Sequence, residues 1–356
     1  MLYSVIMAGG TGTRFWPLSR RKNPKQVISL AEGPSLFERT VARLKRLVPP
    51  ERTYVVTRAE LAPTLRALAP QLPRENVIGE PVGRDSAAAV FLGASIIAHK
   101  DGQAVILVSA ADHLIAPAAR FRAAVRKASG LARHGFLVTF GIPPTRPSTA
   151  YGYVECGAAL PGVAGAFRVR RFHEKPSSRT ARRYLRAKRF FWNSGLFVWK
   201  AATILDAARR FAPEHFAAIS PLGALHGAAG FQASLAAAYR KVNRISIDYA
   251  IMEKARNVAM LKADFDWADV GGPLALRRCM KADGAGNIHI GLVDLLDSRD
   301  CVAVSGDDRL LALFGCEDLV VIQTPDATLV CPADRAEELK KLVSRLDARS
   351  DTAEFL

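Results

Sequence analysis

Residues 3–14 read YSVIMAGGTGTR, in which an apolar segment runs directly into a glycine-rich turn. A continuous apolar run such as residues 3–8 is typical of a buried strand in a parallel sheet. Glycines placed directly after such a strand let backbone N–H groups approach a phosphate closely, because no Cβ intervenes. Arg14 adds a fixed positive charge to the turn. The stretch therefore predicts an α/β fold whose first strand leads into a phosphate-binding turn.

The turn matches neither of two common nucleotide-binding motifs. No Gly-Lys-Ser/Thr follows it, as a Walker A sequence requires, and Phe15 stands where the dinucleotide-binding fingerprint has its third glycine. A glycine-rich turn alone could be an ordinary link between a strand and a helix. Arg14 and Lys25, the latter in the segment PKQ at 24–26, favour phosphate binding because both can neutralise a triphosphate.

Strands and helices alternate as far as residue 141. Further strands are expected at 53–57, 76–79, 104–109 and 136–141, and helices at 35–47, 59–68, 85–99 and 121–132. The first helix has a capping box, with Ser35 as N-cap and Glu38 three residues later. This alternation predicts a mostly parallel, Rossmann-like sheet with helices on both faces.

The rest of the chain has two different patterns. From 151 to about 262 the expected strands, at 151–155, 167–173 and 195–199, are mixed with helices at 180–187 and 201–211. Short strands follow at 287–293, 301–304, 310–314 and 319–323, and then a terminal helix at 333–346. We therefore expect a large catalytic domain, 1–275, and a small β-rich domain with a terminal helix, 276–356.

Composition narrows the class of protein. The formal net charge of +17 is compatible with acidic small-molecule ligands, with nucleic acid, or with a host whose proteins are rich in Arg and Ala. The basic stretch at 179–189 is more typical of a solvated helix face than of a nucleic-acid or membrane-binding module. Five cysteines without a C-x-x-C pair favour reduced thiols in the cytoplasm. No signal peptide is evident, and the longest apolar run, 87–98, is too short to span a bilayer.

Charged residues follow the expected strands, where ligands bind in parallel sheets. Asp112 comes shortly after the strand at 104–109, and a carboxylate beside a phosphate suits Mg²⁺. Taken alone, Asp112 would more often be a turn or capping residue than a metal ligand. Glu174 and Lys175 follow the strand at 167–173, where they could bind a sugar hydroxyl and a phosphate or form a surface ion pair.

A resemblance to a known family makes these interpretations of the glycine turn and the charged residues more specific. Residues 9–20, GGTGTRFWPLSR, together with PKQ at 24–26, resemble the signature of the mannose-1-phosphate guanylyltransferase family (GDP-mannose pyrophosphorylases), and the resemblance covers nearly the whole chain. The chain is similar to the monofunctional bacterial type. The resemblance implies a cytoplasmic, Mg²⁺-dependent homodimer that makes GDP-mannose and diphosphate from GTP and α-D-mannose 1-phosphate, with no nucleic-acid or membrane partner. It also implies that 276–356 form a left-handed β-helix-like domain and that the isomerase domain of longer relatives is absent.

The resemblance also implies roles for individual residues. Arg14 and Lys25 would act in catalysis, and Asp112 and Asp269 would hold the metal. The residues expected to bind the nucleotide are Gly9, Gly10, Gly12, Thr13, Glu80, Arg84, Asp85 and Ser86. Those expected to bind the sugar phosphate are Gly152, Glu174, Lys175, Asn193 and Asp248.

The chain departs from the family pattern at several of these sites. Asp85 and Ser86 replace Asn and Thr, so that two amide donors give way to a charge, although Asp85 could instead cap the next helix. Gly272 and Pro273 stand where the family has Ser and Trp. Transfer from another nucleotide or to another sugar 1-phosphate is therefore the alternative function. A non-catalytic sensor of sugar nucleotides is less favoured, because the expected charged positions are all filled.

Overall fold

The computed structural model describes residues 1–10, 12–20, 23–29 and 33–356, without the side chains of residues 13, 278 and 279. The side chain of Thr13, expected to bind the nucleotide, thus lies outside what is described. The chain divides into two compact units. The larger comprises Met1–Gly9, Val41–Ala110 and Ile115–Trp267, and the smaller comprises Gly10–Thr40, Ala111–Leu114 and Ala268–Leu356.

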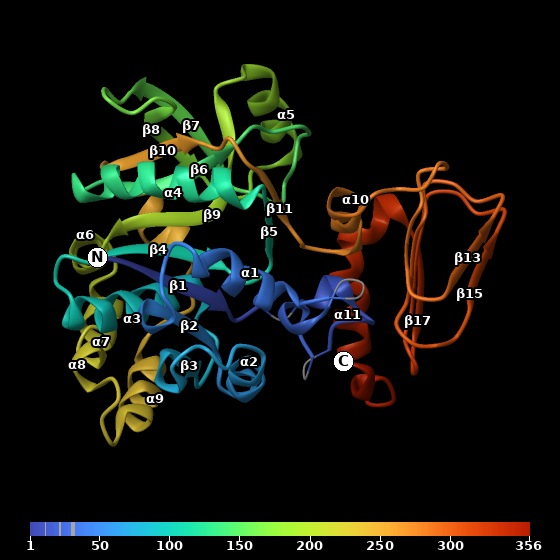
Figure 1. Ribbon diagram of the computed structural model, residues 1–356, viewed down its shortest axis with the longest axis horizontal. Helices are drawn as coiled ribbons and strands as arrows, with labels where there is room; N and C mark the ends of the chain where they lie inside the picture. Colours follow the sequence, from blue (N-terminus) through green and yellow to red (C-terminus); the bar gives the residue numbers. More distant parts are fainter. Residues whose placement is uncertain (11, 21–22, 30–32) are drawn as a thin grey trace. The chain divides into compact units, whose positions relative to one another are not determined.

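The larger unit is built on a nine-stranded sheet in the order β3-β2-β1-β4-β9-β6-β10-β8-β7 (Figure 1). Its strands are β1 (Leu2–Ala8), β2 (Thr53–Arg58), β3 (Val77–Glu80), β4 (Val105–Ala110), β6 (Leu137–Ile142), β7 (Tyr153–Ala159), β8 (Ala166–His173), β9 (Phe190–Lys200) and β10 (Val258–Lys262). The first four strands pair in parallel, as do β6 and β10. β9 runs antiparallel between β4 and β6. The expected α/β sheet is confirmed as a mixed, largely parallel one.

Helices of this unit cover the sheet on both faces. They are α1 (Leu36–Lys45, shared with the smaller unit), α2 (Ala62–Leu68), α3 (Asp85–Lys100), α4 (Ala118–Arg133), α5 (Ser178–Ala187), α6 (Ala201–Phe211), α7 (Pro213–Ile219), α8 (Leu222–Leu225) and α9 (Phe231–Lys241). Successive strand residues point to opposite faces, and both Val5 and Ile6 of β1 are fully buried. A Cβ on Gly93 of α3 would lie 2.7 Å from Cγ2 of Val5, so the glycine permits close packing of α3 on β1.

The capping box predicted for α1 is present. The backbone N–H of Ser35 donates to Oε2 of Glu38 at 2.8 Å, and the N–H of Glu38 donates to Oγ of Ser35 at 3.3 Å. The hydrogen bonds satisfy donors that the first turn of a helix leaves without intrahelical partners. They fix the start of the helix that follows the glycine-rich turn and the Lys25 segment.

The smaller unit contains a β-helix-like domain. In one sheet β12 (Ile288–Ile290), β14 (Val302–Ser305) and β16 (Leu319–Gln323) are parallel, and β17 (Thr328–Pro332) is antiparallel to β16. In a second sheet β13 (Val293–Leu296) pairs in parallel with β15 (Leu311–Phe314). The chain then enters α11 (Leu339–Asp347), as Figure 1 shows. This arrangement confirms the expected small β domain with a terminal helix.

The segment after the glycine-rich turn belongs to the core of the smaller unit. Phe15 and Trp16 are buried in one cluster with Val302, Ile322 and Leu339. The indole Nε1 of Trp16 donates to the carbonyl oxygen of Phe355 at 2.7 Å. The Phe-Trp pair in the signature stretch therefore has a packing role.

Candidate active site

The glycine-rich turn packs against the segment that carries Lys25. Gly12 has a positive φ of 67°, and a Cβ there would lie 2.9 Å from the backbone N of Lys25. The amide Nε2 of Gln26 donates to the carbonyl oxygen of Gly10 at 2.8 Å, and Oγ of Ser19 donates to that of Gly12 at 2.6 Å. Only glycine combines this conformation with so close an approach. The turn and Lys25, which the sequence places 13 residues beyond Gly12, therefore lie together.

The ammonium of Lys25 lies between two carboxylates. Nζ forms an ion pair with Asp112 Oδ2, lies 3.6 Å from Asp269 Oδ1, and donates to the carbonyl oxygen of Val270 at 3.2 Å. Burial by itself would lower the pKa of Lys25, but Asp112 and Asp269 raise it above its usual value. Burial likewise opposes ionisation of Asp112, yet the charge of Lys25 holds its pKa below the usual value. Lys25 and Asp112 are therefore both charged at neutral pH.

Strand pairing brings the two aspartates together from distant parts of the sequence. β5 (His113–Ala116) begins directly after Asp112, β11 (Asp266–Asp269) ends at Asp269, and the two strands pair. The N–H of Val270 also donates to the carbonyl oxygen of Asp112 at 3.3 Å. The predicted metal ligands are thus brought to one place.

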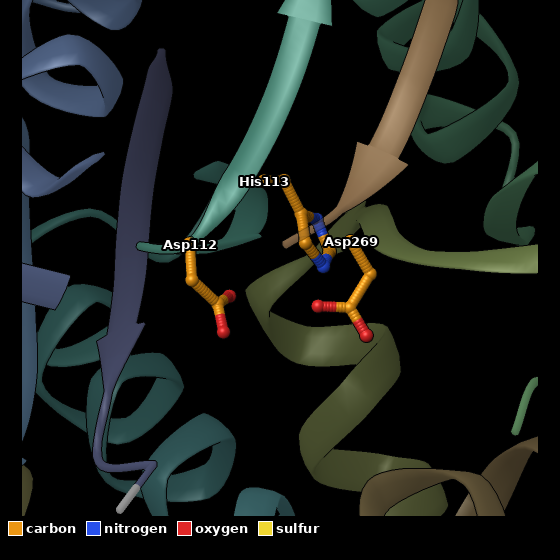
Figure 2. A group of neighbouring side chains, drawn as sticks. All are labelled: Asp112, His113 and Asp269. Atoms are coloured by element: carbon orange, nitrogen blue, oxygen red, sulfur yellow. The ribbon is translucent and has the colours of Figure 1, made fainter. Parts of the chain in front are cut away.

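A histidine joins this pair. Figure 2 shows the side chains of Asp112, His113 and Asp269 converging, and one possible ligand atom from each lies within 4.8 Å of the other two. The sequence predicts no role for His113, although it directly follows Asp112. One sequence signal could have found it: His113, like Asp112, comes shortly after the strand expected at 104–109. Side chains that follow the same strand end can share one site.

The donor set fits a divalent cation. Two carboxylate oxygens are the ligands that hard dications prefer, and they would neutralise the charge of one such ion. The two carboxylates already attract one cation, the ammonium of Lys25, whose place a metal ion would take. Asp112 and Asp269 would hold the ion.

Arg14 lies near one of the two carboxylates, that of Asp269. A Cβ on Gly271 would lie 3.3 Å from Nη1 of Arg14 and 3.5 Å from Oδ2 of Asp269. A Cβ on Gly272 would lie 3.7 Å from Cβ of Arg14. The two glycines, the second of which departs from the family pattern, therefore leave room for the guanidinium. Of the two predicted cationic residues, Lys25 lies against both aspartates and Arg14 lies near Asp269.

The five residues expected to bind the sugar phosphate form one cluster in the larger unit. Nδ2 of Asn193 donates to Oδ1 of Asp248 at 3.0 Å, and Nζ of Lys175 pairs with Oε1 of Glu174 at 2.6 Å. A Cβ on Gly152 would overlap Oε2 of Glu174 and lie 3.5 Å from Cβ of Asn193. The sequence motifs that carry these residues are far apart, and the sheet gathers them.

Two carboxyl groups in this cluster influence each other. Burial raises the pKa of Asp248 to about 7, and the neighbouring charge of Glu174 adds to the effect. Lys175 and the hydrogen bond from Asn193 act in the opposite direction. The cluster therefore offers a hydroxyl-binding acid that titrates near neutral pH beside an ammonium suited to a phosphate.

A second buried carboxyl lies at the end of β3. Glu80 accepts a hydrogen bond of 2.9 Å from the hydroxyl of Tyr239 at Oε1, and its Oε2 would lie 3.5 Å from a Cβ on Gly9. Burial raises the pKa of Glu80 to about 7, Asp85 adds to this, and the Tyr239 hydrogen bond opposes it. Arg84 donates through Nε to the carbonyl oxygen of Tyr239 at 2.8 Å. Tyr239 had no signal in the sequence, because no motif contains it.

Asp85 and Ser86 shape the turn between Glu80 and α3. Asp85 has a positive φ of 66°, and its Oδ1 accepts a hydrogen bond of 2.8 Å from the N–H of Ser86. Its Oδ2 lies 3.5 Å from Nε of Arg244. Oγ of Ser86 accepts from the N–H of Ile247 at 2.9 Å. Aspartate tolerates this left-handed conformation better than most residues, and both side chains tie the turn to residues 244–247.

The parallel strands with a glycine turn after β1, and the two aspartates with their ammonium, are features of the nucleotidyltransferase class. Comparison of the chain with known protein families agrees with this class. Residues 3–285 match the family "Nucleotidyl transferase", and residues 292–346 match the family "MannoseP isomerase/GMP-like beta-helix domain".

Relatives narrow the class further. The chain is 36% identical to a mannose-1-phosphate guanylyltransferase of Escherichia coli over 99% of its length and 75% of that protein, and 37% identical to one of Klebsiella pneumoniae over 97% and 74%. It superposes with a TM-score of 0.86 on a Thermus thermophilus structure described as a mannose-1-phosphate geranyltransferase, at 39% identity and coverage of 97% and 99%. This chain belongs to the mannose-1-phosphate guanylyltransferase family. Among the helices of the described residues, none has the length and apolar character that a membrane span requires.

Proposed function

We propose that this protein transfers GMP from GTP to α-D-mannose 1-phosphate, giving GDP-mannose and diphosphate. The observation that carries the proposal is the ion-paired cluster of Lys25, Asp112 and Asp269, beside a glycine turn in which Gly12 packs closely against Lys25. Membership of the family supports it, since relatives that match nearly the whole chain are named for this activity.

The chemistry needs positioning and charge neutralisation more than covalent catalysis. The sugar phosphate would attack the α-phosphorus in line with the departing diphosphate. Lys25 and Arg14 would stabilise the negative charge that develops on the triphosphate. A divalent cation such as Mg²⁺, held by Asp112 and Asp269, would neutralise part of the same charge when bound. Gly9, Gly10, Gly12 and Thr13 would bind phosphate oxygens through the backbone.

Glu80 is our candidate for selecting the base. Guanine presents two neighbouring N–H donors on one edge, which an ionised carboxylate can accept together, whereas adenine offers an acceptor at the matching ring nitrogen. A buried carboxyl held at one oxygen by Tyr239 suits this task, because its orientation is fixed. Arg84, Asp85 and Ser86 would support the same turn. The alternative function is transfer from another nucleotide or to another sugar 1-phosphate. It rests on Asp85, where a charged carboxylate replaces the amide that the family has.

The sugar 1-phosphate would bind at the cluster of Gly152, Glu174, Lys175, Asn193 and Asp248. Glu174 and Asp248 offer acceptors for sugar hydroxyls, and Asn193 is already oriented by hydrogen bonds to Asp248 and from Thr139. Lys175 would pair with the phosphate. Gly152 would leave room for the sugar ring and for Glu174.

A second copy of the chain is the partner we propose. Leu296 and Phe314 are paired in register on β13 and β15, and they are 60% and 73% exposed. Leu292 and Leu310, which precede these strands, are also exposed. Apolar side chains gathered on one surface of a soluble protein usually mark an interface. We place the homodimer in the cytoplasm, with residues 1–275 carrying the catalytic function and 276–356 this interface, and with no nucleic-acid partner.

The test is turnover by the purified full-length protein, read as diphosphate release. With a divalent cation, GTP and mannose 1-phosphate should react much faster than ATP or glucose 1-phosphate. Lys25→Ala should lower kcat about a hundredfold or more, as loss of one charge-stabilising group typically does. Lys281→Ala, which removes an exposed lysine, is the matched control. Full activity of Lys25→Ala, or equal use of ATP, would refute the assignment.

A further inference from the structure

We propose that His113 is a third protein ligand of the cation held by Asp112 and Asp269, and that it makes this centre bind Mn²⁺ more tightly than Mg²⁺. The inference rests on the proposed metal centre and adds a residue and a metal preference to it.

The three side chains have the spacing that one ion requires. Their ligand atoms all lie within 4.8 Å of one another. Opposite ligands of a six-coordinate ion with bonds of about 2.1 Å are about 4.2 Å apart. Small side-chain rotations therefore bring the three atoms onto a single ion. Figure 2 shows the imidazole ring of His113 beside the carboxylate of Asp269, with Asp112 facing both.

The fold holds the imidazole at this position. His113 is the first residue of β5, which pairs with β11, and β11 ends at Asp269. Its side chain is buried, with only 7% of the residue exposed. A ligand fixed by strand pairing loses little conformational entropy when the ion binds. His113 is therefore held in place by strand pairing beside the aspartates.

The chemistry of the donors decides the preference. Mg²⁺ is a hard ion that prefers oxygen and gives up water reluctantly. Imidazole nitrogen is a common ligand for first-row transition dications, and carboxylate oxygen suits Mn²⁺ as well as Mg²⁺. A set of two carboxylates and one imidazole gains more from Mn²⁺ than from Mg²⁺. Both ions can still occupy the centre, because two carboxylates suffice for Mg²⁺.

Lys25 ties this centre to the substrate. Its ammonium pairs with the carboxylate oxygens that the ion would use. If the aspartates held a cation, the ammonium of Lys25 would be displaced from them by charge repulsion. Lys25 would then be available to pair with the triphosphate.

Pulsed electron paramagnetic resonance tests the ligand directly. Full-length protein, with Mn²⁺ as the only added ion, should show nitrogen modulation of the electron spin echo. Labelling histidine alone with ¹⁵N should shift that modulation, which excludes the amine of Lys25 as its source. The measurement needs no mutation, so it stands even if a His113 variant fails to fold.

Variants then identify the histidine. His113→Asn should abolish the nitrogen modulation, and His289→Asn, at an exposed position on β12, should leave it unchanged. Loss of an outer-shell partner typically weakens metal affinity about 10- to 100-fold, and loss of a ligand should weaken Mn²⁺ at least as much. The affinity for Mg²⁺, measured by competition, should change far less.

Three results would overturn the inference. Mn²⁺ bound to the aspartates without histidine modulation would remove His113 from the centre and leave the proposed function standing. Modulation that persists in His113→Asn would do the same. Binding of Mn²⁺ that is unaffected by Asp269→Asn would instead refute the metal centre itself.

Discussion

The hydroxyl of Tyr239 donates a 2.9 Å hydrogen bond to Oε1 of Glu80, and both side chains are buried. The two residues are 159 positions apart, on α9 and at the end of β3. The hydrogen bond fixes the direction of the Glu80 carboxyl and opposes the rise in its pKa. The pair therefore links the proposed choice of base to pH.

The affinity for GTP should rise with pH through the titration of Glu80. Below its pKa of about 7 the carboxyl is protonated and cannot accept both guanine N–H groups, whereas above it the carboxylate can. The KM for GTP should therefore fall by about tenfold between pH 6 and pH 8, as the ionised fraction grows. Tyr239→Phe removes the hydrogen bond, so the pKa should rise and the change in KM should move to higher pH.

Tyr54→Phe is the matched control for Tyr239→Phe. The buried hydroxyl of Tyr54 has no hydrogen-bond partner among the described residues. Its removal should leave the pH profile of KM unchanged. Asp85 at the start of α3 also faces Glu80, so the profile should be repeated in Asp85→Asn. An identical profile in Tyr239→Phe and the unmutated protein would contradict the link.

Loss of Lys25 should destabilise the protein in a way that a dication repairs. Lys25→Ala leaves Asp112 and Asp269 facing each other without a neutralising charge. Breaking a largely buried ion pair typically lowers the free energy of unfolding by about 3–5 kcal/mol, and partial exposure of the aspartates should reduce this to about 2–3 kcal/mol. Urea denaturation with and without Mn²⁺ measures the effect. The ion should stabilise Lys25→Ala more than the unmutated protein. Equal stabilisation of both would argue against a cation site at the place that the Lys25 ammonium occupies.

Gly152→Ala should impair use of the sugar phosphate alone. The added Cβ would overlap Oε2 of Glu174, which must move away from Lys175 and the sugar. We expect kcat/KM for mannose 1-phosphate to fall about a hundredfold, as misplacement by about 1 Å can cause, while GTP binding stays unchanged. Gly130→Ala is the control, because a Cβ on this helical glycine meets no atom within 4 Å. Equal loss in both variants, or loss of GTP binding, would argue against the assignment.

The exposed apolar surface of β13 and β15 should hold two copies together. Phe314→Glu and Leu296→Glu place charges on the two most exposed side chains of that surface. Light scattering after size exclusion should show twice the chain mass for the unmutated protein and a single chain for either variant. Val330→Glu, an exposed position on β17 in the other sheet, should remain dimeric. An unmutated monomer would refute the dimer.

Local sequence signals predicted much of the architecture. The apolar run of β1, the Ser35–Glu38 capping box and the helix expected at 201–211 each depend on neighbouring residues, and all three are present. The antiparallel direction of β9 is decided by contacts with β4 and β6 that are distant in sequence. Periodicity within one segment carries no information about such partners.

In the candidate site, too, local sequence signals predict some residues, and contacts between distant residues decide the others. Asp112 and Asp269 could be paired through the family resemblance, and strand pairing brings them together. No sequence motif assigns a role to His113, which joins them, or to Tyr239, which orients Glu80. Each role depends on a partner that only the folded chain brings close. The glycines at 271–272 leave room for the guanidinium of Arg14, and the sequence alone does not show that these segments lie together.

The hydrogen bond from Trp16 to Phe355 has a consequence for synthesis of the protein. A ribosome releases the glycine turn early, but the acceptor for Trp16 lies 339 positions further along the chain. The nascent turn can therefore complete its packing only after Phe355 has left the exit tunnel. Removing residues 353–356 should disturb the phosphate-binding turn, even though the deleted residues would never touch a nucleotide.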